Sequence, residues 1–325
     1  MRFLIVWGDF MILQFILLIV GFILLIKGAD IFVDGASNIA LNFKVSKMLI
    51  GLTIVAFGTS APEFAVSVQA MLNNNGEVVL GNVIGSNILN ILLILGLSSL
   101  LCKLTVKSAT VKKEIPLTIL LTMAVSVLLL DNLFDKSSIN MLSRGDGITL
   151  LLFFAIFIYY LFSVMKNKKD NDNEDAKYTL GKSFLFTCLG IAGIIFGSDL
   201  VVNSATHIAK FLHISDRIIS LTVIAFGTSL PELVTSIVSA RKGEQDILIG
   251  NIIGSNLFNI GVVLALPITL FGSVVPIEFN YYDLAVMILS ALMLFGFTFK
   301  NYSLDKKSGI IMLLTFTVYY TAILI

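Results

Sequence analysis

The chain has 325 residues, of which 57% are hydrophobic and 13% charged, against roughly 25% charged in ordinary soluble domains. This composition excludes a water-soluble globule, because so much apolar surface needs lipid to cover it. The balance of 22 Lys and Arg against 21 Asp and Glu leaves no basic excess for nucleic acid. We therefore expect an all-α integral membrane protein.

Apolar runs separated by short polar breaks predict about ten transmembrane helices, since roughly 20 apolar residues cross a bilayer. In chain order they cover residues 10–40, 47–72, 77–101, 113–131, 146–165, 182–210, 217–240, 246–271, 281–299 and 308–325. A polar linker at 166–181 separates a first five-helix unit, residues 1–165, from a second, residues 182–325.

Lysine and arginine fall mostly in alternate loops of this arrangement. The positive-inside rule then places both termini outside and the linker 166–181 in the cytoplasm. We expect a multi-pass protein of the cell (plasma or inner) membrane, surrounded by lipid and with no obligate protein partner.

The sequence contains an internal repeat with a shift of 169 residues. LTIVAFGTSAPE at 52–63 corresponds to LTVIAFGTSLPE at 221–232, and GNVIGSNILNI at 81–91 corresponds to GNIIGSNLFNI at 250–260. Because each unit has an odd number of spans, the second copy enters the membrane from the opposite side. Inverted repeats with interrupted helices are typical of secondary transporters, whose substrate site lies near the bilayer midplane.

The helix that carries GTSAPE is predicted to break within that motif. Pro62 has no N–H to donate to the carbonyl of Gly58, and its ring crowds the preceding turn. Thr59 and Glu63 are four positions apart, so they share a helix face at the break. Pro231, within GTSLPE, repeats the arrangement in the second unit.

The second repeated motif adds hydroxyl and amide oxygens. Ser86 and Asn90 have the same four-residue spacing, and Ser255 and Asn259 match them in the second unit. Carboxylates, hydroxyls, amides and freed carbonyls are all hard oxygen donors. With no His or Cys among them, this set favours Ca²⁺ or Na⁺ over zinc, copper or iron.

Charge balance suggests what such a site does. Burying Glu63 and Glu232 close together as bare charges would cost many kcal/mol. One divalent cation cancels both charges, and so do two or more monovalent ions at overlapping positions. Competition of two ion types for one charge deficit is the physical basis of exchange.

Two further acidic residues, Asp30 and Asp199, also occupy equivalent positions. They are expected either to line an ion path or to cap a bent span near an interface. Lys27 is expected to extend to the interface or to pair with Asp30, one turn away.

The paired motifs resemble the two α-repeats of the calcium/cation antiporter superfamily, and above all its prokaryotic sodium/calcium exchanger branch. The resemblance implies electrogenic exchange of Na⁺ for Ca²⁺ by alternating access, with the first and sixth spans sliding across a bundle of eight. It also implies an ion site made of the carbonyl oxygens of Ala56 and Ala225 and the side chains of Thr59, Ser60, Glu63, Ser86, Asn90, Thr228, Ser229, Glu232, Ser255 and Asn259.

One position departs from the family pattern. Some members carry Asp where this chain has Asn259, so the centre here has two carboxylates and two amides. The charge balance then rests on two glutamates, and proton binding by a third carboxylate is in doubt.

We hypothesise a secondary antiporter with Ca²⁺ and Na⁺ as transported ions and no cofactor. H⁺/Ca²⁺ or K⁺-dependent exchange is the alternative within the same class, and a passive cation channel is the alternative from another class. An enzyme is disfavoured, because the sequence has no Ser–His or paired-Asp catalytic arrangement and no nucleotide-binding loop.

Overall fold

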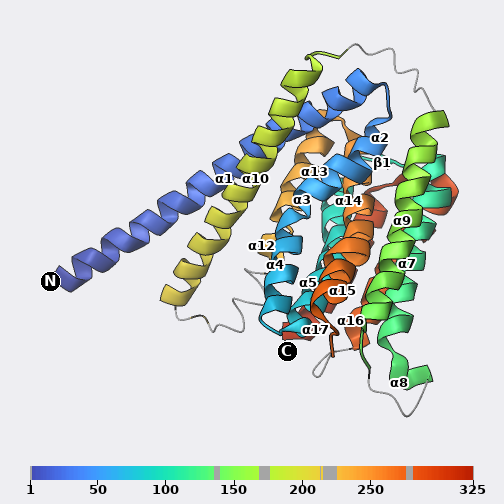
Figure 1. The fold of residues 1–325 in the computed structure, drawn as a ribbon. Helices are drawn as coiled ribbons and strands as arrows, with labels where there is room; N and C mark the ends of the chain where they lie inside the picture. Colours follow the sequence, from blue (N-terminus) through green and yellow to red (C-terminus); the bar gives the residue numbers. More distant parts are fainter. Residues whose placement is uncertain are drawn as a thin grey trace.

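The computed structural model describes residues 2–134, 140–167, 176–212, 214, 225–275 and 281–324, and it is mostly helical (Figure 1). The first part of the chain forms α1 (Arg2–Phe43), α2 (Lys47–Ile50), α3 (Ala56–Thr59), α4 (Ala61–Leu72), α5 (Gly76–Ile88), α6 (Gly96–Leu101), α7 (Ile115–Leu129), α8 (Asp131–Phe134) and α9 (Arg144–Asn167). The second part forms α10 (Leu180–Phe211), α12 (Ala225–Thr228), α13 (Leu230–Lys242), α14 (Gln245–Phe258), α15 (Ala265–Phe271), α16 (Tyr281–Asn301) and α17 (Lys306–Leu324).

Among the described residues, six helices are long and apolar enough to cross a membrane by themselves. They are Met11–Phe43, Gly76–Leu101, Arg144–Met165, Leu180–Phe211, Gln245–Phe271 and Tyr281–Asn301. The bent pair Lys47–Thr59 and Ala61–Leu72 makes a seventh candidate. Helices also lie in the other predicted ranges, but α7 and α13 have only 15 and 13 residues, so the count of ten stays a prediction.

Several of these long elements change from α-helix to π-helix along their length. The π-helical segments are η1 (Gly51–Val55), η2 (Leu89–Leu95), η3 (Thr110–Glu114) and η5 (Asn259–Leu264). Two of them, η2 and η5, contain the repeated Asn90 and Asn259. π-Helical turns are rare and concentrate at functional sites. The π-helical segments η2 and η5 therefore indicate a functional role for the regions around Asn90 and Asn259.

The prediction of an all-α fold needs one small correction. Two strands of two residues each, β1 (Leu104–Thr105) and β2 (Ser303–Leu304), pair antiparallel. They join the connection after α6 to the connection after α16. A pair this short cannot bury a sheet face, so its contribution is to fix these two connections to each other.

Helices α1 and α10 lie against each other and stand to one side of the remaining bundle (Figure 1). Glycines on both helices permit this close contact. A Cβ added at Gly28 would lie 2.8 Å from the backbone nitrogen of Ile194, and one added at Gly190 would lie 2.6 Å from the Cα of Phe32. Small residues that let backbones approach are the usual basis of helix pairing in lipid.

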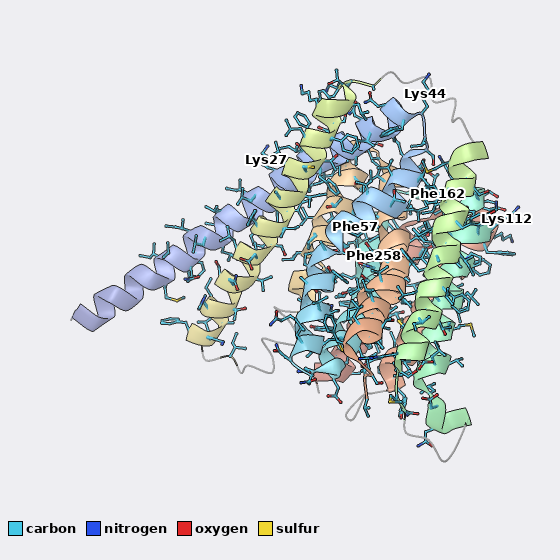
Figure 2. The ribbon with its side chains drawn as sticks, viewed as in Figure 1. Lys27, Lys44, Phe57, Lys112, Phe162 and Phe258 are labelled. Atoms are coloured by element: carbon cyan, nitrogen blue, oxygen red, sulfur yellow. The ribbon has the colours of Figure 1, made fainter. Side chains whose placement is uncertain are left out.

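The buried apolar side chains form two clusters. The larger cluster fills the bundle, and the smaller one joins α1 to Ile194 and Val201 of α10 and to α13. The two parts of the chain also contact each other where the exposed Phe57 of α3 packs edge-on against the buried Phe258 of α14, with ring centroids 5.0 Å apart (Figure 2).

Candidate ion-binding site

Both predicted helix breaks are present. Ser60 separates α3 from α4 with φ −84° and ψ 7°, and the two helical pieces meet at an angle of 45°. Ser229 separates α12 from α13 with nearly the same conformation, φ −89° and ψ 5°. Each break is followed by the proline of the motif, at the start of the next helix. Equivalent residues thus produce equivalent breaks in the two units.

The two glutamates lie in the first turns of the helices after these breaks. Glu63 of α4 and Glu232 of α13 are both completely buried. The hydroxyl of Ser60 donates to Glu232 Oε1 at 2.9 Å, and the hydroxyl of Ser229 donates to Glu63 Oε1 at 3.4 Å. Each carboxylate is therefore held by the helix break of the other unit, which brings the two acids to one centre.

Three more predicted side chains join the same network. Ser86 lies 3.2 Å from the hydroxyl of Ser229, and Ser255 donates to Glu232 Oε1 at 3.5 Å. Thr59 donates to the side-chain oxygen of Asn251 at 3.0 Å and lies 3.5 Å from Ser255. Glu232 is thus contacted by hydroxyls from both units, and Ser86 adds a hydroxyl next to the Ser229 that donates to Glu63.

The amides form two equivalent pairs across the units. Asn90 donates to Asn256 Oδ1 at 2.9 Å, and Asn259 donates to Asn87 Oδ1 at 3.1 Å. Asn87 and Asn256 are themselves equivalent, 169 positions apart. They were not among the predicted site residues, although their identity in both copies of the repeated motif was a usable signal.

Another equivalent amide pair also belongs to this network without having been predicted. Asn82 donates to the backbone carbonyl of Glu63 at 2.9 Å and to Ser67 at 3.0 Å, and its counterpart Asn251 accepts from Thr59. These amides fix the backbone and hydroxyls next to the carboxylates.

Four buried oxygen atoms of the predicted ligands have no hydrogen-bond partner among the described residues. They are Glu63 Oε2, Glu232 Oε2, Asn90 Oδ1 and Asn259 Oδ1. A buried acceptor without a partner costs about 1–3 kcal/mol, and more when it is charged. Two carboxylate and two amide oxygens, one of each from each unit, therefore suit a hard cation that is transferred from water.

The remaining predicted ligands are Ala56, Ala225 and Thr228. The carbonyl of Ala56 already accepts from the backbone N–H of Ser60 at 3.0 Å and from the hydroxyl of Thr59 at 3.3 Å. Ala225 begins α12 next to residues 215–224, which lie outside the described residues. Thr228 lines a cavity of about 430 Å³ that also reaches Pro62 and Asp199.

The two equivalent aspartates have different surroundings. Asp199 of α10 is exposed and lines that cavity. Asp30 of α1 forms an ion pair with Lys242 of α13 at 2.8 Å. The expected pairing of Asp30 with Lys27 is therefore wrong among the described residues, because a lysine from another helix occupies this position.

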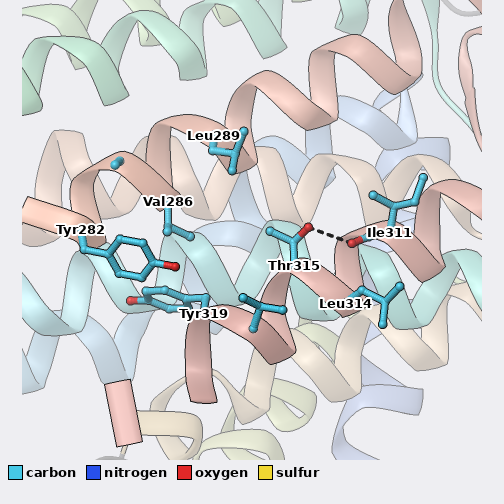
Figure 3. Close-up of a pocket in the computed structure, with 9 residues that line it drawn as sticks. Tyr282, Val286, Leu289, Ile311, Leu314, Thr315 and Tyr319 are labelled. Carbon is cyan, nitrogen blue, oxygen red and sulfur yellow. Dashed lines mark hydrogen bonds between the residues drawn. The ribbon is translucent and has the colours of Figure 1, made fainter. Parts of the chain in front are cut away.

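A second cavity lies between α16 and α17 (Figure 3). It measures about 450 Å³ and is lined mainly by apolar side chains such as Val286 and Leu289. Its Thr315 hydroxyl donates to a carbonyl of its own helix, and Tyr319 donates to Asp283. None of the predicted ion ligands lines it, so we assign no ion chemistry to this cavity.

The comparisons with known proteins identify the family. The family model described as sodium/calcium exchanger protein matches residues 13–163 and again residues 182–325. The chain belongs to the sodium/calcium exchanger family. It is 38% identical over 268 residues to the inner membrane protein YrbG of Escherichia coli, which covers 79% of this chain and 80% of that protein.

Other members of the exchanger family match over nearly their full lengths. The sodium/calcium exchanger MaX1 of Methanosarcina acetivorans is 29% identical over 323 residues, 89% of this chain and 91% of that protein. The solved structure of the sodium-calcium exchanger NCX_Mj soaked with Na⁺ superposes with a TM-score of 0.82 and 33% identity, over 95% of this chain and 98% of that one. These matches make the chain a membrane protein of an antiporter family.

Proposed function

We propose that this protein exchanges Na⁺ for Ca²⁺ across the membrane by alternating access, with the transported ions bound between Glu63 and Glu232. The observation that carries the proposal is the set of four unpartnered buried oxygens, Glu63 Oε2, Glu232 Oε2, Asn90 Oδ1 and Asn259 Oδ1. Oxygen is the ligand atom that Ca²⁺ and Na⁺ take from proteins.

Electrostatics explains why the two ion types compete. Two fully buried carboxylates cannot both stay ionised without positive charge nearby. One Ca²⁺ or several Na⁺ ions would supply that charge, and either load would leave the centre nearly neutral. A site without bound ions would keep its uncompensated negative charge. This charge opposes the change between the two access states of the empty site, so the movement of Ca²⁺ in one direction is coupled to the movement of Na⁺ in the other.

We propose the ten-span topology together with this function. One support for this topology is that a single family model matches both parts of the chain. Another is that the equivalent helices α4 and α13 run in opposite directions, because α4 runs away from the end of the molecule where α2 lies and α13 runs toward it (Figure 1). The first unit is residues 1–165 and the second is residues 182–325, with 166–181 as the linker.

Orientation follows from the charged residues. Lys44 lies at the end of the molecule where α9 ends and α10 begins, whereas the marked chain ends lie toward the opposite end (Figures 1 and 2). By the positive-inside rule we assign the Lys44 end to the cytoplasm and both termini to the outside of a plasma or inner membrane.

Two features support alternating access to the site. A cavity of about 430 Å³ reaches Pro62 and Thr228, each next to a site residue. The α1–α10 pair borders this cavity through Asp199, and its buried apolar side chains belong to a cluster separate from the larger one that fills the bundle, although this cluster also includes Val238 of α13. We assign this pair the sliding movement that the family resemblance implies.

Counter-ion-resolved flux tests the proposal. The purified chain is reconstituted into proteoliposomes, and uptake of ⁴⁵Ca²⁺ is measured with an outward gradient of Na⁺, H⁺ or K⁺ imposed alone, and with none. We expect uptake with the Na⁺ gradient only. Uptake driven only by H⁺ or K⁺ would assign a different counter-ion, and equal uptake without any gradient would indicate a passive channel.

A further inference from the structure

Three buried hydroxyls follow Glu232 along α13. Thr235, Ser236 and Ser239 are 0% exposed and lie three, four and seven positions after Glu232. Residues at this spacing share one helix face. They therefore form a line from the carboxylate toward Lys242, the last residue of the helix.

These hydroxyls, like that of Ser98, differ from most buried hydroxyls of the bundle. Ser126 and Thr298, for example, donate to the carbonyl four positions earlier in their own helices at 2.7 Å. Thr235, Ser236 and Ser239 have no hydrogen-bond partner among the described residues. Unpartnered buried hydroxyls destabilise a fold, so a line of three indicates that water reaches this face in another conformation.

The internal repeat indicates where that conformation opens. Val66 and Val202 line the cavity beside Asp199, and the 169-residue shift maps them onto Thr235 and Val33. Both of these counterparts are 0% exposed. The same positions thus border an open space in one unit and a packed contact between α1 and α13 in the other.

Charged residues hold that packed contact together at the end of α13. Lys242 Nζ lies 2.8 Å from Asp30 and 2.7 Å from Asp34, both on α1. Partial burial works to lower the pKa of Lys242, but its hydrogen bonds to Asp30 and Asp34 outweigh this and raise the pKa above the ordinary value. The lysine therefore stays charged, and Ser37 of α1 adds a 2.9 Å hydrogen bond to Glu244.

Most of the positions equivalent to these charged residues carry asparagine instead. The repeat maps Lys242 onto Asn73 and Glu244 onto Asn75. Asp34 maps onto Asn203. Of the paired groups only Asp30 keeps its charge in the other unit, as Asp199. An ion-paired contact between α1 and α13 is therefore a property of one end only.

We propose that Thr235, Ser236 and Ser239 line the second ion passage of the transporter, and that Lys242 with Asp30 and Asp34 is a latch that keeps this passage closed. The inference rests on the proposed alternating access to Glu63 and Glu232. Because the latch has no counterpart, it favours the conformation in which the cavity beside Asp199 is open, and this bias is present without any ion bound.

Thiol accessibility tests the latch without relying on ion transport. The two cysteines, Cys102 and Cys188, are free and are first replaced by alanine. Thr235→Cys then reports the closed passage and Val66→Cys the open cavity, each in proteoliposomes exposed to a membrane-impermeant charged thiol reagent on one side. Val66→Cys should react from the side opposite Lys242, and Thr235→Cys should react slowly, from the Lys242 side.

Removing the latch should move the two reporters in opposite directions. We expect Lys242→Met to raise the labelling rate of Thr235→Cys about fivefold or more, equivalent to about 1 kcal/mol in the conformational equilibrium, and to lower that of Val66→Cys. Lys242→Arg should restore the original rates. Lys107→Gln is the matched control, since Lys107 forms an ion pair of similar length, 2.7 Å, with Asp246 of α14.

Each other outcome overturns the latch. Faster labelling of both reporters would mean that Lys242→Met only loosens the protein, and unchanged rates would mean that the ion pairs do not hold the passage closed. Labelling of Thr235→Cys from the side of the Asp199 cavity would show that these hydroxyls do not line a passage that opens on the Lys242 side. ⁴⁵Ca²⁺ flux measured on the same preparations separates these failures from a failure of the proposed exchange.

Discussion

The hydroxyl of Ser60 donates a 2.9 Å hydrogen bond to Glu232, which lies 172 positions later in the chain. The equivalent hydroxyl of Ser229 donates to Glu63. Each helix break therefore supports the carboxylate of the other unit rather than its own. A change in the position of one break should therefore alter the position of the carboxylate from the other unit.

The carboxylates themselves provide the first prediction. Glu63→Gln or Glu232→Gln halves the charge available to a divalent ion, and we expect Na⁺-driven Ca²⁺ uptake to fall by at least roughly 100-fold, since breaking one buried charged contact costs about 3–5 kcal/mol. Size-exclusion profiles in detergent should stay unchanged.

A buried glutamate outside the site serves as the control for this pair. Glu114 is 5% exposed and accepts a hydrogen bond from Tyr160, so Glu114→Gln removes a buried carboxylate without touching the site. Its uptake should remain close to that of the unmodified protein. Near-normal uptake by Glu63→Gln or Glu232→Gln would remove that residue from the site.

The hydroxyls at the two breaks should contribute unequally. Ser60→Ala removes a 2.9 Å contact and Ser229→Ala a 3.4 Å contact, so the first should weaken Ca²⁺ binding more, by about tenfold for a bond to a charged group. The half-saturating Ca²⁺ concentration for uptake measures the effect. Ser126→Ala, whose hydroxyl bonds only within its own helix, should change nothing. Equal responses of all three variants would argue that the hydroxyls do not position the carboxylates.

Adding a third carboxylate should make transport depend on pH. In Asn259→Asp the new acid is surrounded by two others, which favours its protonated form. At low pH it is neutral and close in shape to asparagine, so uptake should approach that of the unmodified protein. As pH rises the acid ionises, retains cations and loses the donor to Asn87 Oδ1, so uptake should fall.

Flux between about pH 5 and pH 9 checks this sign, and Asn90→Asp, the equivalent change in the first unit, should behave alike. A flat profile for both variants, with the protein still folded, would show that these amides do not border the transported ions.

The contact between α1 and α10 predicts opposite effects for two similar substitutions. A Cβ at Gly190 would lie 2.6 Å from the backbone of Phe32, whereas nothing described lies within 4 Å of one at Gly296 on α16. Gly190→Ala should therefore destabilise by about 1–3 kcal/mol, and Gly296→Ala should stabilise by about 0.5–1 kcal/mol. Thermal unfolding in detergent measures both. Stabilisation by Gly190→Ala would contradict the close approach of these helices.

Hydropathy predicted the position of most helices, because polar residues bound the apolar runs. The predicted span 182–210 corresponds to α10 at Leu180–Phe211, and 246–271 corresponds to Gln245–Phe271. Helix α1 extends beyond its predicted end at residue 40 as far as Phe43. Near this end, the side-chain oxygen of Asn38 accepts from the backbone N–H of Lys177, and its side-chain N–H donates to the backbone carbonyl of Asp34.

The breaks at Pro62 and Pro231 and the convergence of Glu63 with Glu232 were also predictable, since each follows from local chemistry and the repeat. The partners Asn87 and Asn256 were not predicted, because their roles depend on pairing across the units. The contact of Lys242 with Asp30 depends on the packing of α1 on α13 and has no local signature. The π-helical segments likewise reflect tertiary packing rather than helix propensity.

The crossed hydrogen bonds also have a consequence for biogenesis. Chains grow at about 5–20 residues per second, and Ser229 is 166 positions after Glu63, so α4 leaves the ribosome roughly 10–30 s before its partner hydroxyl has been made. During this interval an acidic side chain must wait at the translocon or in the bilayer without its final neighbours. Arrival of α13 then completes both carboxylate contacts in one assembly step, which makes the late insertion of the second half the event that commits the nascent chain to a functional transporter.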